Sequence, residues 1–289
     1  KSDGRLSLEI YAANALLAAQ DTMDGIKTGV GDIGITYMST MPGKFPVGSV
    51  FELPGTYESA NASAAAVNVA MAEWQPPEMD GVKVLMYYGG GPGVILSQTP
   101  LTSMADFKGL QVRTNSTLAK TVEALGGTPV TMQMGEVYEA MRTGVVDAYI
   151  GAVESIGAWK LAEVAKYMTF FPMLNTVHIM IMNQDTYDSL PPDLQQVLED
   201  VVADVYDNKI LNYFDNQGLI AIQNAKTENN LDITVLSDAE YAEWLTAAQS
   251  TVDAYIKELD GKGLDGAAYI KTWQDLMAKY NAEYPNPYK

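Results

Sequence analysis

The residue best placed to do chemistry in this sequence is Arg113, which ends a short apolar strand predicted at Leu110–Arg113. A helix capped by Asn115 or Ser116 is predicted to follow at once. In an open α/β sheet, ligands bind beyond the carboxyl ends of the strands, where the unpaired N–H groups of the next helix favour an anion. An arginine there can hold a carboxylate with two parallel hydrogen bonds. Position alone leaves open the alternative, an ion pair with a surface carboxylate.

The sequence lacks motifs for catalysis. It has no cysteine and one histidine, which excludes disulfides, thiolate nucleophiles and cysteine-based metal sites. The histidine, His178, lies in an apolar run, where a core role is favoured over that of a base. Gly89–Gly93 follows a strand but has neither the helix nor the lysine of a nucleotide loop. We therefore expect no catalytic residue, cofactor, nucleotide or metal site, and keep as an alternative an α/β enzyme with Asp147 or His178 as base.

Three tyrosines, Tyr37, Tyr88 and Tyr149, are predicted at or near strand ends. There a tyrosine can line a cleft with an apolar ring and a hydroxyl group. We predict that these three, together with Asn115 and Asn175, contact a ligand near Arg113. Core packing is the alternative for most of the 17 tyrosines.

Composition limits the partners of this chain. The 289 residues are 47% hydrophobic, which predicts a globular protein of about two domains. The net charge of −18 argues against nucleic acid and anionic membranes, but not against a small anion held by a local arginine. No apolar run is long enough to span a bilayer. The chain opens at Lys1, so we expect a mature product whose signal peptide has been removed.

The elements that must position Arg113 alternate between strand and helix, which favours mostly parallel sheets covered by helices. Arg5–Tyr11 alternates apolar and polar residues and is predicted to be a strand. Gly89–Gly93 is the candidate crossover or hinge. From Pro191 to about Lys226 an apolar periodicity predicts one helix of roughly 50 Å, long enough to span two lobes. Amphipathic helices are predicted at Asp238–Leu259 and Ala267–Tyr280.

Three motifs carry a family resemblance. DFKGLQVR, ALGGTPVTM and GEVYEAMRTGVVDA, between residues 106 and 148, resemble the DctP-type solute-binding proteins of TRAP (tripartite ATP-independent periplasmic) transporters. The resemblance places Arg113 on the family's carboxylate-binding arginine and Met134 on a position that often holds a pocket aromatic. Gly151 falls where many members carry a ligand-binding Asn, and Gly93 lies near a second Arg of some members. The missing anchors favour a small monocarboxylate, such as a 2-oxo or 2-hydroxy acid; a C4-dicarboxylate and a small sulfonate are the alternatives.

The resemblance also implies the architecture and the cellular role. It implies a periplasmic-binding-protein-like fold of two α/β lobes with the ligand cleft between them, a long helix across both, and the family's first strand and helix absent here. Lobe I would hold 1–89 and about 179–218, and lobe II about 90–178 and 219–289. Hinge closure on a small organic acid and delivery to TRAP membrane permease subunits would be its mechanism. A ligand-sensing domain of a signalling protein is a further alternative.

Overall fold

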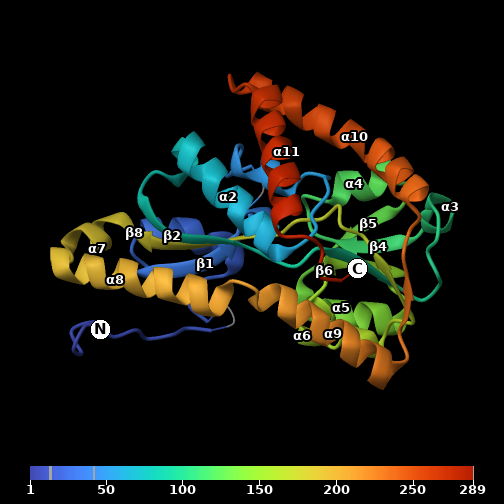
Figure 1. Cartoon of the computed structure of the whole chain (residues 1–289), viewed down its shortest axis with the longest axis horizontal. Coiled ribbons are helices and arrows are strands. Elements are labelled where there is room, and N and C mark those ends of the chain that lie inside the picture. The colour runs from blue at the N-terminus through green and yellow to red at the C-terminus, as the bar shows by residue number, and fades with distance from the viewer. Residues whose placement is uncertain (13–14, 42, 289) are drawn as a thin grey trace.

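Two sheets form the framework of the molecule (Figure 1). The structure is a computed structural model that describes residues 1–12, 15–41 and 43–288. The first sheet has the strand order β1-β8-β2, with both pairs antiparallel. The second has the order β5-β4-β6-β3-β7-β9 and mixes parallel with antiparallel pairs. The strands are β1 (Ile33–Tyr37), β2 (Val82–Gly89), β3 (Gly93–Ser97), β4 (Gln111–Thr114), β5 (Thr128–Thr131), β6 (Ala148–Ala152), β7 (Tyr167–Phe170), β8 (Val177–Asn183) and β9 (Asp232–Thr234).

The helices cover both sheets, which confirms a two-lobed α/β fold. They are α1 (Thr22–Lys27), α2 (Ala60–Trp74), α3 (Met104–Phe107), α4 (Ala119–Ala124), α5 (Met134–Thr143), α6 (Ser155–Ala158), α7 (Gln184–Ser189), α8 (Pro192–Val205), α9 (Tyr213–Asn229), α10 (Asp238–Gly261) and α11 (Gly266–Glu283). The expectation of mostly parallel sheets is wrong for the first sheet. Its central strand β8 enters from the second sheet and runs opposite to both neighbours.

The second sheet is buried on both faces. Along β3, Val94 and Leu96 pack into one hydrophobic cluster with helices α5, α6 and α9, whereas Ile95 packs into another with α4 and α10. Successive side chains of a strand point to opposite faces, so a strand covered on both sides must be apolar throughout. This explains why β3 is a continuous apolar run. Its hydrogen-bonded neighbours are β6 and β7.

The chain passes between the sheets at residues 89–93, 170–177 and 205–213, and again along α10. The glycines of the first crossing are explained by close packing. A Cβ on Gly89 would lie 2.7 Å from the Ala60 carbonyl oxygen, and one on Gly93 would lie 2.5 Å from the Phe171 carbonyl oxygen. The first crossing therefore lies against α2 at Gly89 and against the second crossing at Gly93, and a side chain at either glycine would force these segments apart.

The single helix predicted from Pro191 to Lys226 is wrong. The structure has two helices in line, α8 and α9, which together pass beneath both sheets (Figure 1). Between them, Tyr206–Ile210 forms a π-helical turn and Asn212 takes a left-handed backbone with φ of 64°. Asparagine tolerates that conformation, and the Asn212 N–H donates to the side chain of Asn61 at 3.0 Å. The break therefore lies at a crossing between the lobes.

Helix α10 is the continuous helix that contacts both lobes. Its Trp244 and Ala248 pack with the second sheet, whereas Val252 and Leu259 pack into the cluster of the first sheet and α2. At 1.5 Å per residue its 24 residues extend about 36 Å. Helix α11 then packs on α2. Residues 219–289 were expected in lobe II, whereas α11 packs into the hydrophobic cluster of the first sheet.

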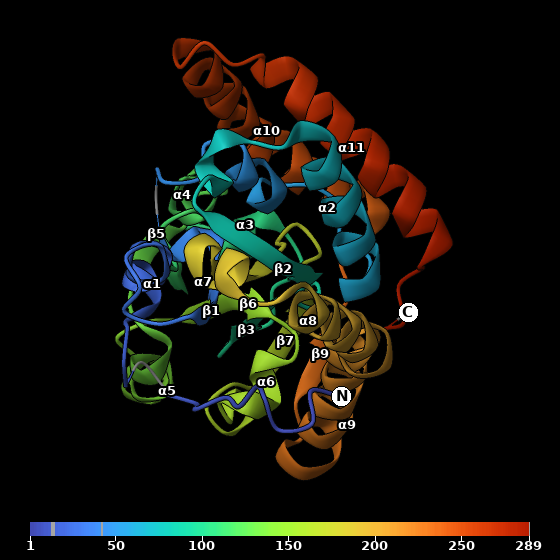
Figure 2. The same cartoon turned by 90° about the vertical axis from the view of Figure 1, so that its left-hand side faces the viewer.

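The strand predicted at Arg5–Tyr11 is also wrong. The segment has no regular structure and exposes Leu8 and Ile10, which are 77% and 84% accessible. An alternating sequence becomes a strand only when another strand offers its hydrogen-bonding edge, and no strand in the described residues pairs with this one. The segment instead lies along α8, where Arg5 forms an ion pair with Asp193. Helices α10 and α11 cover the opposite side of the molecule (Figure 2).

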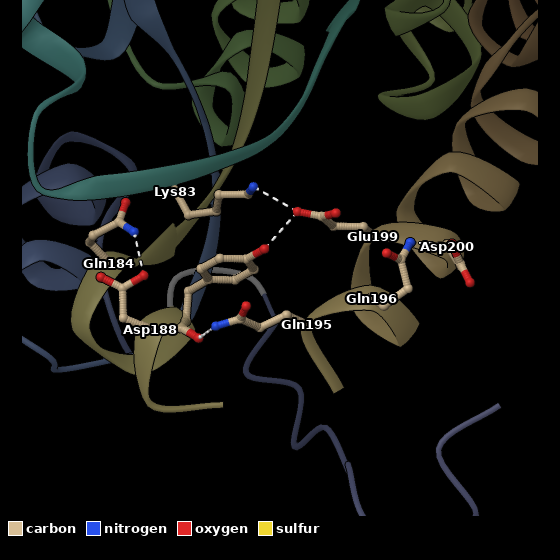
Figure 3. A network of polar contacts seen from close by, with 8 residues as sticks. Lys83, Gln184, Asp188, Gln195, Gln196, Glu199 and Asp200 are labelled. Atoms are coloured by element: carbon tan, nitrogen blue, oxygen red, sulfur yellow. Dashed lines mark hydrogen bonds and ion pairs between the residues drawn. The ribbon is translucent and has the colours of Figure 1, made fainter. Parts of the chain in front are cut away.

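A polar network fastens α7 and α8 to the first sheet (Figure 3). Lys83 of β2 forms an ion pair with Glu199 of α8 at 2.8 Å, and the Tyr187 hydroxyl donates to the same carboxylate at 2.6 Å. The Lys83 ammonium also lies 4.5 Å from the centroid of the Tyr187 ring. Because Lys83 and Glu199 are partly exposed, the network orients these helices more than it stabilises the fold.

Candidate functional site

Arg113 lies at the carboxyl end of β4, between Val130 of β5 and Tyr149 of β6. Only 7% of the residue is exposed. Its Nη2 donates to the Met132 carbonyl oxygen at 2.9 Å, while its Nε is buried without a hydrogen-bond partner. The guanidinium carbon lies 5.4 Å from the centroid of the Tyr149 ring. No carboxylate of the described residues forms a salt bridge with Arg113.

The charge of Arg113 is therefore buried without an opposite charge. Burial lowers its pKa, and the neighbouring Tyr149 and Tyr37 act in the other direction. Arginine nevertheless stays protonated, because its ordinary pKa exceeds 12. A buried cation without a counterion costs free energy unless a partner neutralises it. In a chain with twice as many acidic as basic residues, 36 against 18, this arrangement leaves a place for a ligand's negative group.

Tyr149 explains why residue 151 is glycine. Its buried hydroxyl contacts the Ser155 hydroxyl at 2.9 Å, and its ring leans over Gly151. A Cβ on Gly151 would lie 1.7 Å from the Tyr149 hydroxyl oxygen, a distance at which the two atoms overlap. The tyrosine hydroxyl therefore stands where a side chain of residue 151 would begin. Gly151 itself can offer a ligand no side-chain contact.

Tyr37 and Tyr88 lie in one row of the first sheet with His178 between them. The strand register pairs His178 with both tyrosines. Tyr88 stacks on His178 at 4.8 Å between ring centroids, and Tyr37 meets His178 edge-on at 5.2 Å. Phe214 of α9 stacks on Tyr88 at 5.6 Å and on His178 at 5.5 Å. We call Tyr37, Tyr88, His178 and Phe214 the aromatic row.

His178 is neutral at physiological pH. Burial lowers its pKa to about 4, because the charged imidazolium would lose its hydration. Its Nδ1 is buried and has no hydrogen-bond partner. His178 is only partly exposed, in keeping with the expected core role, although its Nδ1 has no hydrogen-bond partner. No carboxylate in the described residues orients the ring as a catalytic base would require.

The other predicted site residues have local partners. The Asn115 side chain accepts from the Leu118 N–H at 2.9 Å and so caps the turn after β4. Asn175, only 2% exposed, donates to the Phe51 carbonyl oxygen at 2.9 Å and accepts from the Ser63 hydroxyl at 2.7 Å. These bonds give Asn175 a role in joining the 170–177 crossing to the first lobe. Met134 begins α5 and packs, partly buried, on the cluster of the second sheet.

The sequence analysis did not predict two carboxyl groups with raised pKa values near the crossings, the buried Glu52 and the partly buried Glu154. Burial raises the pKa of Glu154 to about 7 and that of Glu52 to about 8. Glu154 accepts from the Gly91 N–H at 3.1 Å, at the first crossing. A Cβ on Gly90 would lie 3.1 Å from Glu154 Oε1 and 3.7 Å from His178 Cε1, so this carboxyl lies beside the aromatic row. Single glutamates in mixed sequence give no signal of such burial.

A separate pocket lies elsewhere on the molecule. It has a volume of about 340 Å³ and is lined by residues 53–57 together with side chains of α10 and α11, including Trp273 and Met277. None of the predicted site residues lines it. The described residues contain no group of three or more side chains suited to hold a metal ion. In the same part of the chain, no helix is long and apolar enough to cross a bilayer.

Two α/β lobes with several crossings between them, and an arginine at a strand end with no salt-bridge partner in the described residues, are typical of two-lobed solute-binding proteins. The chain belongs to the DctP family, described as bacterial extracellular solute-binding protein family 7, which matches residues 1–258. This membership confirms a binding protein rather than an enzyme, and its extracytoplasmic location.

Relatives whose ligands are known bind different classes of solute. The C4-dicarboxylate-binding periplasmic protein DctP of Rhodobacter capsulatus is 27% identical, over 85% of this chain and 76% of its own. The ectoine-binding protein TeaA of Halomonas elongata is 28% identical, over 70% of this chain and 57% of its own. A marine metagenome TRAP solute-binding protein specific for aromatic acids, in complex with metahydroxyphenylacetate, is 29% identical with a TM-score of 0.89, over 97% of this chain and 90% of its own. The family therefore fixes the class but not the ligand.

Proposed function

We propose that this chain is the solute-binding protein of a TRAP transporter and captures a small organic acid with one carboxylate, such as a 2-oxo or 2-hydroxy acid. Arg113 would bind the carboxylate, and the loaded protein would deliver it to the membrane permease subunits. The observation that carries the proposal is the buried guanidinium of Arg113, which has a free Nε and no carboxylate partner in the described residues.

The surroundings of Arg113 favour one negative charge over two. Tyr149 lies near the guanidinium, with 5.4 Å between its ring centroid and the guanidinium carbon, and interacts electrostatically with both Arg113 and Glu154. Asp215, which is buried, interacts electrostatically with Glu154 and accepts from the Ala60 N–H at 2.9 Å. A second carboxylate on the ligand would therefore meet acidic groups, which repel it at short range.

Closure of the lobes would give the Arg113 contact its strength. Arg113 belongs to the second sheet and Tyr37 to the first, and the Ser116 hydroxyl donates to the Ser39 carbonyl oxygen between them at 3.4 Å. A ligand that contacts both lobes favours the closed arrangement. Exclusion of water then strengthens the attraction between the guanidinium and the carboxylate.

A thermal-shift and calorimetry panel tests the proposal. Butyrate, pyruvate, lactate, benzoate and cyclohexanecarboxylate would be compared with succinate as the dicarboxylate and with a small alkyl sulfonate. We expect at least one monocarboxylate to raise the melting temperature in a concentration-dependent way, because it binds only the folded chain. Tighter binding of succinate or the sulfonate would replace the monocarboxylate assignment, and no response to any acid would contradict the proposal as a whole.

A further inference from the structure

The aromatic row gives the site a wall of ring surfaces. Tyr37, His178 and Tyr88 come from the three neighbouring strands of the first sheet and point to the same face, because the register pairs them directly. Phe214 approaches them from α9, just after the break at Asn212. The centroids of the three stacked rings, Tyr88, His178 and Phe214, lie within 5.6 Å of one another.

The row begins close to the guanidinium. The Ser116 hydroxyl, three residues after Arg113, donates at 3.4 Å to the carbonyl oxygen of Ser39, two residues after Tyr37, so the ends of β4 and β1 lie close together. Tyr149 and Tyr37 both act to raise the pKa of Arg113. Tyr37 in turn contacts His178 and interacts electrostatically with Tyr88. The aromatic row therefore extends from Tyr37, at the end of β1 that lies near the end of β4, along the first sheet.

The row carries no full charge. Its histidine is neutral because burial lowers the pKa to about 4, and burial raises the pKa of Tyr88 to about 12, so its hydroxyl stays protonated. Such a surface stabilises flat apolar groups by ring stacking. A flexible polyol or a second anion would lose hydration there without gaining matched partners.

We propose that the ligand is an aromatic carboxylic acid, whose ring packs against the aromatic row while its carboxylate meets Arg113. This inference rests on the proposed function and adds the chemical class of the body of the ligand. Gly151 makes room for the Tyr149 ring, whose hydroxyl occupies the space that a side chain of residue 151 would fill.

A matched pair of acids tests the inference. Benzoate and cyclohexanecarboxylate have the same charge and ring size, but only benzoate has a π-system. Because a stacked aromatic contact contributes roughly two- to tenfold in affinity, we expect benzoate to bind the wild-type chain at least about fivefold tighter. The Phe214→Leu and Tyr37→Leu variants should reduce this ratio towards one while still binding cyclohexanecarboxylate.

Tyr280→Leu is the matched control, since Tyr280 stacks on Tyr284 in α11, away from Arg113. It should leave the ratio unchanged. Phe214→Leu and Tyr37→Leu alter different elements, so the test still works if one of them fails to fold. The melting temperature without ligand shows whether each variant folds. If cyclohexanecarboxylate, lactate or pyruvate binds the wild-type chain as tightly as benzoate or more tightly, the aromatic assignment is wrong but the Arg113 proposal is unaffected. If none of the acids binds, both proposals fail.

Discussion

Replacement of Arg113 by methionine separates binding from folding. Methionine keeps much of the length and flexibility of the side chain and removes the charge. In the wild-type chain the guanidinium gives the fold one hydrogen bond, to the Met132 carbonyl oxygen, while its Nε is buried and unpaired. The cost of losing that bond, about 1 kcal/mol, is opposed by relief of the burial of an uncompensated charge, which costs several kcal/mol. We therefore expect the ligand-free melting temperature to stay constant or to rise.

Ligand affinity, in contrast to stability, should fall strongly in Arg113→Met. A carboxylate held by two charge-assisted hydrogen bonds would lose about 3–5 kcal/mol, which is roughly a 100- to 4,000-fold loss of affinity. Isothermal calorimetry with the best-binding acid of the panel measures this loss, and differential scanning calorimetry measures stability. Arg113→Lys should recover little, because an ammonium group cannot make the two parallel contacts.

Arg142→Met is the matched control. Arg142 lies on α5, is largely exposed and pairs with Glu139 one turn away. Its replacement should change neither affinity nor stability by more than about 1 kcal/mol. An Arg113→Met variant with undiminished affinity, or one that melts well below the wild type without ligand, would refute the reasoning, since it would make the guanidinium a structural group.

Three further predictions concern the surroundings of Arg113. Gly151→Ala should displace the Tyr149 ring, because its Cβ would overlap the hydroxyl oxygen; we expect a loss of stability of about 1–3 kcal/mol and weaker acid binding in calorimetry, and an unchanged affinity would contradict the placement of Tyr149. Asn175→Ala should lower the free energy of unfolding by about 2–4 kcal/mol in denaturant titrations, since Phe51 and Ser63 lose their buried partner, and should leave ligand affinity in folded protein nearly unchanged. Burial raises the pKa of Glu154 in the folded state to about 7, so above the ordinary carboxyl pKa the folded chain binds more protons than the unfolded chain, and stability should fall as the pH rises from about 4.5 through 7. Glu154→Gln should make the melting temperature less dependent on pH over that range. An equally steep dependence in the variant would contradict this prediction.

Local patterns in the sequence determined the part of the site that depends on a few neighbouring residues. Arg113 ends an apolar strand and precedes a capped turn, and both features are encoded between Leu110 and Leu118. The alternation of strands and helices around it predicted the α/β class, because side-chain periodicity reflects local backbone geometry. The crossing at Gly89–Gly93 was predicted for the same reason, although close packing rather than backbone freedom explains Gly89 and Gly93.

Tertiary contacts decided the elements that need a distant partner. Arg5–Tyr11 has the alternation of a strand but pairs with no strand of the described residues. The helix expected from Pro191 breaks at Asn212, where the chain crosses between lobes. Helix α11 covers α2 of the first lobe although it follows a helix that begins on the second sheet.

The chemical character of the site also came from the tertiary structure. The aromatic row joins residues 37, 88, 178 and 214, which only the register of the first sheet and the turn into α9 bring together. Likewise the missing counterion of Arg113, the neutral imidazole of His178 and the raised pKa of Glu154 depend on which surfaces exclude water. Periodicity is a property of neighbouring residues, whereas desolvation depends on residues far apart in the chain. The sequence therefore determined which residue carries the charge, and the folded structure determined that this charge lacks a partner.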